Sequence, residues 1–198
     1  QRCLAGEILV PIGDIYEKVR DQYLEAARKL KIGYGLDQDT QMGPLASKDQ
    51  LDKVNGYIQK GVDEGAKLLL DGRKVKADKY PNGFFIGPTL FDDVTPQMTI
   101  FKEEIFGPVI GITRAKTLDE AIALANTSTY GNAASIFTSS GRAAREFAYR
   151  IEAGNVGINI GVPAPIAFFT FGGWKDSFFG DLHGQGREGI DFYTQNKV

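Results

Sequence analysis

The sequence predicts an α/β fold built on an open, mainly parallel twisted sheet with flanking helices. From residue 109 onward, short apolar runs at 109–113, 133–138 and 155–160 alternate with helical patterns. Crossover helices of that length join parallel strands, and such sheets bind ligands beyond the carboxyl ends of their strands. The composition agrees with a globular domain, because 42% of the 198 residues are hydrophobic and 24% are charged.

Two helices are predicted ahead of that alternation. Asp14 and Glu17 match a capping box, and apolar residues then recur at three- and four-residue steps until Gly33. A second helix is predicted from Ser47 to Gly65. Its expected apolar face consists of Leu51, Val54, Ile58 and Val62.

The remaining elements follow in order. An apolar run at 66–70 predicts a strand, and a second capping-box pattern at 117–120 opens a helix to about Asn126. Another helix is predicted over 141–151. Its inward-facing residues are expected to be Ala144, Phe147, Ala148 and Ile151. Residues 163–189 are rich in Gly and Phe and read as a long ordered loop, after which residues 190–195 have strand-like composition.

Charge and cysteine content exclude several classes of protein. A net charge of −2 provides no basic field for nucleic acid or an anionic membrane, and no apolar run is long enough for a membrane-spanning helix. One Cys and one His cannot form an intrachain disulfide or a Cys/His zinc site, so no metal is expected. The single thiol favours a reducing compartment, either a bacterial cytoplasm or a mitochondrial matrix. Because the chain begins at Gln1 without Met, we expect it to be part of a longer protein.

Cys3 is the first candidate for chemistry. A lone Cys is more often a small buried apolar residue than a nucleophile. Arg2 is adjacent, and residues 4–9 are compatible with a short helix that starts at the Cys. Both a nearby cation and a helix N-terminus stabilise thiolate, which is the reactive form.

A second candidate is the segment 103–108. Its structural interpretation is a charged turn before a strand, with Gly-Pro as punctuation. Its functional interpretation is a carboxylate that accepts two hydrogen bonds from a ribose diol. Composition alone favours the turn.

The loop before the C-terminus contains patterns that we interpret structurally. Residues 184–189 fit G-x-G-x-x-G, but a Gly/Phe loop precedes them and a strand-like run follows, so the dinucleotide fingerprint is rejected. His183 is expected to face solvent or to brace this loop rather than to pair with Cys3. Packing is also the expected role of the aromatic residues Phe168, Phe169, Phe171, Trp174, Phe178 and Phe179.

Seven blocks resemble the aldehyde dehydrogenase superfamily, in family order and across essentially the whole chain. They are residues 1–3 (QRC), 42–45 (MGPL), 83–90 (GFFIGPTL), 102–109 (KEEIFGPV), 130–133 (YGNA), 171–173 (FGG) and 192–197 (FYTQNK). Within the superfamily the chain most resembles the CoA-acylating methylmalonate-semialdehyde dehydrogenases. The residues that carry this narrower likeness are 1–3, 70–75, 163–165 and 169–175.

The resemblance implies roles for three residues. Cys3 matches the family nucleophile, Glu104 the residue that holds the nicotinamide ribose, and Phe106 the aromatic beside the nicotinamide. NAD is thus the implied cofactor and CoA the implied acyl acceptor. The role of Arg2 is inferred from chemistry and not from the resemblance. A substrate that carries a carboxylate needs a cation near the nucleophile, and Arg2 is the nearest candidate. The cofactor domain, the oxyanion-hole Asn and the general-base Glu of hydrolytic relatives lie upstream of Gln1 in the family.

The resemblance also implies domain organisation and partners. Residues 1–189 match the catalytic domain, and residues 190–198 match the start of a strand through which subunits pair into dimers or tetramers. The expected function is oxidation of methylmalonate or malonate semialdehyde to an acyl-CoA through a Cys3 thioester. Two alternatives stay open at this point. One is an aldehyde dehydrogenase that releases a free acid, and the other is an inactive oligomerisation and packing module.

Overall fold

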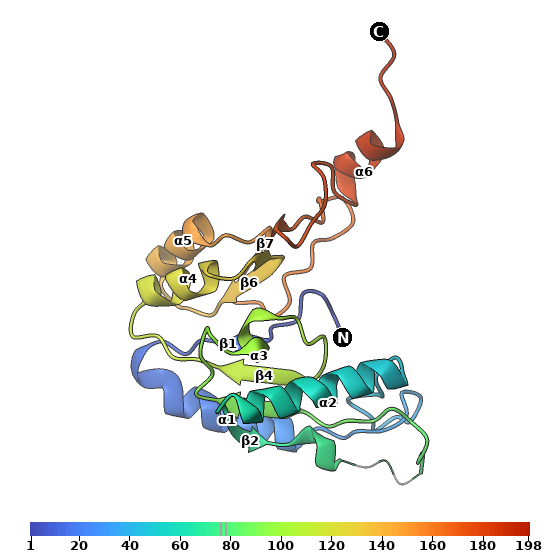
Figure 1. The fold of residues 1–198 in the computed structure, drawn as a ribbon. Coiled ribbons are helices and arrows are strands. Elements are labelled where there is room, and N and C mark those ends of the chain that lie inside the picture. The colour runs from blue at the N-terminus through green and yellow to red at the C-terminus, as the bar shows by residue number, and fades with distance from the viewer. Residues whose placement is uncertain (76, 78) are drawn as a thin grey trace. The chain divides into compact units, whose positions relative to one another are not determined.

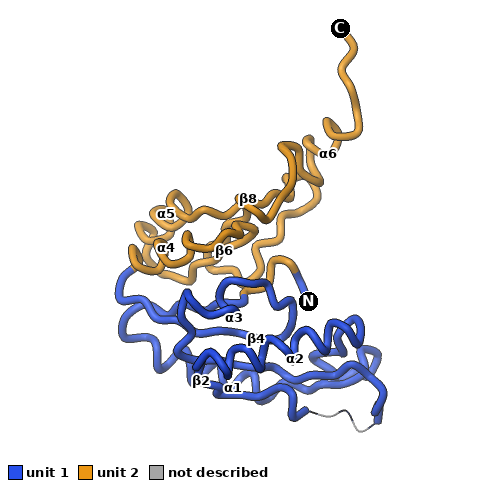
Figure 2. Tube along the Cα trace, in the orientation of Figure 1, with its two compact units in different colours: residues 1–2, 7–117 blue, residues 3–6, 118–198 orange. Residues whose placement is uncertain are grey.

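A four-stranded sheet forms the centre of the first part of the chain (Figure 1). The structure is a computed structural model that describes residues 1–75, 77 and 79–198. The chain divides into two units, coloured separately in Figure 2. The first unit comprises residues 1–2 and 7–117, and the second comprises residues 3–6 and 118–198.

The sheet of the first unit is mixed but mainly parallel. Its strands lie in the order β1 (Ile8–Leu9), β4 (Val109–Ile112), β3 (Thr89–Asp92) and β2 (Lys67–Leu70). β1 and β3 both pair with β4 in parallel, whereas β2 pairs with β3 antiparallel and has an irregular register between Leu68 and Leu70. All four residues of β3 are buried, as expected for a strand covered on both faces.

Helices of the first unit cover both faces of the sheet. They are α1 (Tyr16–Arg28), α2 (Lys48–Asp63) and α3 (Thr99–Lys102), with 3-10 turns η1 (Gly13–Ile15) and η2 (Gly72–Lys74). Phe91 packs towards α2, because a Cβ atom built on Gly61 would lie 3.0 Å from its ring. The next residue, Asp92, accepts a hydrogen bond from Tyr16 of α1. Since successive strand residues face opposite sides, α1 and α2 lie on opposite faces.

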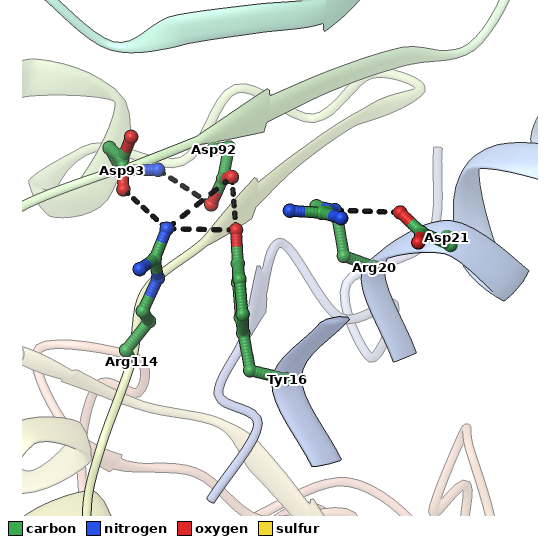
Figure 3. Close-up of polar contacts among 6 residues, drawn as sticks. All are labelled: Tyr16, Arg20, Asp21, Asp92, Asp93 and Arg114. Atoms are coloured by element: carbon green, nitrogen blue, oxygen red, sulfur yellow. Dashed lines mark hydrogen bonds and ion pairs between the residues drawn. The ribbon is translucent and has the colours of Figure 1, made fainter. Parts of the chain in front are cut away.

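Tyr16 ties α1 to the sheet through a buried carboxylate (Figure 3). Asp92 is 1% exposed and accepts hydrogen bonds from the Tyr16 hydroxyl and from the Asp93 backbone N–H, the latter at 2.8 Å. Arg114 stacks over the Tyr16 ring with its guanidinium carbon 3.8 Å from the centroid, and it donates to the Tyr16 hydroxyl at 2.9 Å. The buried charge therefore has hydrogen-bond donors, as buried carboxylates require.

The second unit contains a parallel strand pair and a short antiparallel pair. Its elements are α4 (Leu118–Asn126), β5 (Tyr130–Gly131), β6 (Ala133–Ile136), α5 (Gly141–Arg150), β7 (Asn155–Ile158), β8 (Trp174–Lys175) and α6 (Gly186–Tyr193). β6 and β7 are parallel and are joined by α5, while β5 pairs antiparallel with β8. The buried cluster of this unit is formed by Ile122, Phe147, Ile151 and Ala153.

Several predicted elements are confirmed. The Ser47 side chain caps α2 by accepting from the Gln50 N–H at 3.1 Å. Val54 and Ile58 of the predicted apolar face are 0% exposed. The apolar runs at 66–70, 109–113, 133–138 and 155–160 contain β2, β4, β6 and β7. The α/β class and the parallel β6–α5–β7 unit follow from the alternation of these runs with helices.

Other local predictions are wrong. Asp14 does not cap α1, because residues 13–15 form a 3-10 turn and Ile15 occupies the N-cap position without a side-chain bond. The apolar residues Val62 and Ala148 are exposed rather than inward. β4 and β6 belong to different sheets, so the single sheet expected from residue 109 onward does not form.

The two ends of the chain also differ from expectation. Residues 4–9 are not a helix that starts at Cys3, since Cys3 and Leu4 form a turn and Ile8–Leu9 is strand β1. Residues 190–193 belong to α6 instead of a strand. A helix satisfies its backbone hydrogen bonds within itself, whereas a strand needs a partner. The proposed role of residues 190–198 in subunit pairing stays a prediction.

Within the described ranges 1–75, 77 and 79–198, no helix is long and apolar enough to cross a membrane.

Candidate active site

Cys3 lies in an exposed turn of the second unit. Its neighbour Leu4 is 6% exposed and anchors the turn. The Asn132 side-chain amide donates to the Cys3 carbonyl oxygen at 2.6 Å. The backbone of the nucleophile candidate is therefore fixed while its thiol faces solvent.

Asn132 is itself held by a second asparagine. The Asn132 carbonyl accepts from the Asn155 backbone N–H at 2.9 Å and from its side-chain amide at 3.0 Å. Asn155 is 7% exposed, and the same amide also donates to the Gly172 carbonyl at 2.6 Å. The turn of Cys3 is thus connected to the parallel β6–β7 pair. Sequence reasoning gave neither asparagine a role, although Asn132 lies in the block 130–133 that carries the resemblance.

Arg2 belongs to the first unit and is exposed. The residue before it, Gln1, accepts a hydrogen bond from the Ala46 backbone N–H at 3.0 Å. Leu45, next to Ala46, is buried and donates its N–H to the Phe84 carbonyl at 2.9 Å. The segment that leads to Cys3 is therefore fixed on the first unit, and the role of Arg2 stays a prediction.

Glu104 and Phe106 lie on the segment between α3 and β4 of the first unit. Between them Ile105 is 2% exposed and belongs to the main core cluster. Lys53 of α2 donates to the Glu104 carbonyl at 3.2 Å, while the Glu104 side chain is exposed. An exposed carboxylate on a fixed backbone fits the ribose-binding role that the resemblance implies, because both oxygens remain accessible to a diol.

Phe106 has an unusual backbone conformation. Its φ of 57° is in the left-handed region, which non-glycine residues rarely adopt. The following Gly107 cannot carry a side chain without disturbance, because its Cβ atom would lie 2.5 Å from a methyl group of Val54. Such strained positions persist only where surrounding structure determines them, and they cluster at functional sites.

His183 braces its loop, as predicted. Its Nδ1 lies 3.1 Å from Glu188 Oε2, and its backbone N–H donates to the same oxygen at 3.0 Å. The ring also makes an edge contact with Phe178, with 4.2 Å between centroids. The neighbouring G-x-G-x-x-G pattern does open a helix, α6, contrary to the expected strand. The described residues 176–185 before it contain no strand, so the dinucleotide fingerprint is still incomplete.

Not all aromatic side chains of the segment 163–189 are buried by packing. Phe171 and Phe178 are partly buried. By contrast, Phe168, Phe169, Trp174 and Phe179 are between 54% and 94% exposed. Phe168 and Phe169 nevertheless contact each other, with 5.1 Å between their ring centroids. Within the described chain, the packing interpretation is wrong for Trp174 and Phe179.

Comparison with known proteins gives one consistent result. The family profile described as "Aldehyde dehydrogenase family" matches residues 1–198. The malonate-semialdehyde dehydrogenase of Halalkalibacterium halodurans is 47% identical over 198 residues, which are 100% of this chain and 40% of that protein. Malonate-semialdehyde dehydrogenase 2 of Geobacillus kaustophilus is 48% identical over all of this chain and 41% of its own length. The chain thus spans about two fifths of these relatives.

Solved structures agree with the sequence relatives. The crystal structure of methylmalonate-semialdehyde dehydrogenase from Oceanimonas doudoroffii superposes with a TM-score of 0.94 at 44% identity, over 98% of this chain and 40% of that one. The NAD+ complex of an aldehyde dehydrogenase from Bacillus cereus gives a TM-score of 0.91 at 38% identity, over 98% and 38% of the two chains.

Proposed function

Because the chain belongs to the aldehyde dehydrogenase family, we propose that the full-length protein oxidises malonate or methylmalonate semialdehyde with NAD and forms an acyl-CoA through a Cys3 thioester. The observation that carries the proposal is the exposed Cys3 thiol on a backbone fixed by Asn132. The names of the relatives support the substrate class, and the NAD complex of the Bacillus cereus enzyme supports the cofactor.

In the proposed reaction the Cys3 thiolate attacks the aldehyde carbon and forms a carbon–sulfur bond. The electron pair of the carbonyl moves to its oxygen, and the Cys3 backbone N–H is a natural donor to that oxyanion. NAD supplies the acceptor for the hydride that leaves the former aldehyde carbon. Cys3 then carries a thioester, which CoA thiolate cleaves with return of the Cys3 thiolate. The substrate carboxylate is lost as CO₂ during this sequence.

Glu104 and Phe106 hold the cofactor in this proposal. The two oxygens of the exposed Glu104 carboxylate accept hydrogen bonds from the nicotinamide ribose hydroxyls. Phe106, fixed at a φ of 57°, presents its ring beside the nicotinamide. Fixing the cofactor in this way lowers the entropic cost of reaching the reactive geometry.

Arg2 recognises the carboxylate of the substrate. Semialdehyde acids carry that group one carbon from the aldehyde, and a guanidinium presents a planar pair of donors that matches it. Arg2 is adjacent to Cys3 in the sequence and is exposed.

The names of the relatives support a proposal for the natural setting of the reaction. They are bacterial proteins, and a single thiol suits a reducing compartment, so we place the protein in a bacterial cytoplasm. Assembly as a homo-oligomer is supported by the exposed apolar side chains of the C-terminal segment. Ile190, Phe192 and Tyr193 are 65%, 60% and 85% exposed, as side chains that await a partner surface would be.

The test is to supply the full-length protein with methylmalonate semialdehyde and NAD, with and without CoA, and to identify the product by mass. Formation of propionyl-CoA that depends on CoA is the expected result. Release of a free acid at the same rate without CoA would contradict the acylating reaction and leave a hydrolytic aldehyde dehydrogenase. No NAD reduction under either condition would contradict the proposed function as a whole.

A further inference from the structure

Two side chains satisfy all four backbone polar groups of Ile105 and Phe106. Glu7 accepts from the Phe106 N–H at 2.9 Å and from the Ile105 N–H at 3.4 Å. The amide of Gln50 donates to the Phe106 carbonyl at 2.8 Å and to the Ile105 carbonyl at 3.2 Å. These two residues belong to no helix or strand, so side chains replace the partners that secondary structure would normally supply.

The two side chains come from different elements. Glu7 immediately precedes β1 and lies four positions after Cys3 in the sequence, whereas Gln50 is in the first turn of α2. The backbone N–H of the same Gln50 donates to the side chain of Ser47, the N-cap residue of α2. The cap uses only the backbone of Gln50, so its side-chain amide is available for the contacts with Ile105 and Phe106.

We propose that Glu7 and Gln50 are positioning residues for the cofactor loop, which comprises residues 104–106, and that they hold Phe106 in its left-handed conformation so that Glu104 and Phe106 meet the nicotinamide ribose. This inference rests on the proposed function of Glu104 and Phe106. Without its hydrogen bonds to Glu7 and Gln50, the backbone of Phe106 would leave the left-handed region, because a residue with a Cβ atom disfavours that conformation. Turning the backbone there would reorient the side chains on both sides of Ile105.

Charge at Glu7 supports this role. Burial raises its pKa above the ordinary value, although the two backbone N–H groups oppose the shift. Of the charged groups around it, Glu104 raises the pKa and Lys53 of α2 lowers it. A carboxyl with a raised pKa in the folded state makes folding less favourable as the pH rises through that pKa. Ionised Glu7 thus stabilises the folded state less than protonated Glu7 does.

The ionised carboxylate is the form that accepts both N–H groups. As the pH falls through the raised pKa, protonation turns one oxygen into a donor, and the contact with the loop weakens. In Glu7→Gln the amide nitrogen would face a backbone N–H at every pH. The wild type should therefore lose affinity for NAD on the acid side, and the variant should be weak and insensitive to pH in that range.

The experiment measures kcat and the KM for NAD against pH in the full-length protein. Glu7→Gln should raise the KM for NAD about tenfold at neutral pH, in line with loss of one charge-assisted hydrogen bond, and kcat should change less. Gln50→Met, which keeps the Ser47 cap, should raise the same KM without the change in pH profile. Glu25→Gln removes the same charge from an exposed position on α1 and should match the wild type.

Three outcomes separate the inference from the proposed function. An unchanged KM for NAD in both Glu7→Gln and Gln50→Met, with Glu104→Gln strongly impaired, would overturn the inference and leave the proposed function intact. A KM that rises in Glu7→Gln over the same pH range and by the same factor as in the wild type would also overturn the part assigned to its ionisation. Absence of NAD-dependent oxidation in the wild type would defeat the proposed function itself. If Glu7→Gln does not fold, Gln50→Met alone decides the loop contact.

Discussion

At Cys3, the proposed nucleophile is exposed while the backbone around it is fixed by side chains distant in the sequence. Asn132 reaches the Cys3 carbonyl, and Asn155 holds Asn132 through two bonds to its carbonyl. A thiol on a fixed turn needs little reorganisation to attack a bound aldehyde, because its approach is already restricted. The contacts of Cys3 therefore come from the fold of the second unit and not from a local helix.

Removing the Asn132 contact should slow the reaction. In Asn132→Ala the Cys3 carbonyl loses a 2.6 Å hydrogen bond, and we expect kcat/KM for the semialdehyde to fall about tenfold, since misplaced reacting groups cost that much or more. Steady-state kinetics of the full-length protein provide the measurement. Asn82→Ala, at an exposed position of the first unit, is the control. Equal kcat/KM in the two variants would show that this bond does not position the nucleophile.

Replacing Arg2 should change substrate preference. Arg2→Ala should reduce kcat/KM for semialdehyde acids about tenfold or more and leave simple aldehydes nearly unaffected, because only the former carry a carboxylate for a bidentate contact. Competition between methylmalonate semialdehyde and propionaldehyde measures the effect. Arg142→Ala removes an exposed cation from α5 and serves as the control. A preference that survives in Arg2→Ala would leave this residue without a role in recognition.

The same residues show how far sequence reasoning reaches at this scale. The residues themselves make Cys3 and the segment 103–108 candidates, but only the resemblance gives Cys3, Glu104 and Phe106 specific roles, because a lone Cys or a Glu in a turn has several ordinary explanations. Asn132, Glu7 and Gln50 make contacts that span 55 to 129 positions. Glu7 is 98 positions from Ile105, Gln50 is 55 positions from Ile105, and Asn132 is 129 positions from Cys3. No local pattern encodes such contacts.

On the scale of elements, the attachment of α1 to β3 depends on Tyr16. Its hydroxyl donates to the buried Asp92 and accepts from Arg114 (Figure 3). Burial, followed by the hydrogen bond to Asp92, raises the pKa of Tyr16, so the hydroxyl stays protonated as a donor. This contact compensates a carboxylate that would otherwise be costly to bury.

Tyr16→Phe tests that attachment. Loss of one donor to a buried carboxylate should lower the free energy of unfolding by about 1–3 kcal/mol. Chemical denaturation gives the value, and Tyr149→Phe, at a side chain that is 91% exposed, is the matched control. If the two variants unfold at the same denaturant concentration, Tyr16 does not stabilise the buried Asp92.

Long elements with strong periodicity were predictable, and short ones were not. The Ser47 cap and the buried positions Val54 and Ile58 of α2 were predictable because cap and period agree along 16 residues, whereas Val62 near the end of the helix is exposed. β1, β5 and β8 contain 2 residues each. Such short strands show no periodicity in the sequence and are defined only by their pairing with another strand. Residues 190–193 have aromatic side chains typical of strands, yet they form the end of α6, where backbone bonds are made within the helix.

For the whole molecule, the division into two units and the greater length of the relatives suggest what activity the isolated chain can have. The nucleophile candidate lies in one unit and the cofactor loop in the other, and the chain spans 40% of the Halalkalibacterium relative. In the family resemblance, the cofactor domain lies upstream of Gln1. A packing and oligomerisation role is therefore the alternative for the isolated 198 residues.

We expect the 198 residues alone to show no NAD-dependent oxidation, because the family resemblance puts the cofactor domain upstream of Gln1. The measurement is NAD reduction by the isolated chain at high protein concentration, beside the full-length protein at the same molar concentration. Light scattering on the same sample reports whether the exposed C-terminal segment forms oligomers. NAD reduction by the isolated chain would contradict the expectation that it is inactive without the cofactor domain.

The proposed thioester on Cys3 is tested most directly by rapid mixing of the full-length protein with methylmalonate semialdehyde and NAD in the absence of CoA. Since hydride leaves before the thioester is cleaved, the wild type should produce a burst of NADH equal to its concentration of active sites and then turn over slowly. Cys3→Ala should bind NAD as the wild type does and give no burst. A burst of equal size in Cys3→Ala would contradict the assignment of Cys3 as the nucleophile.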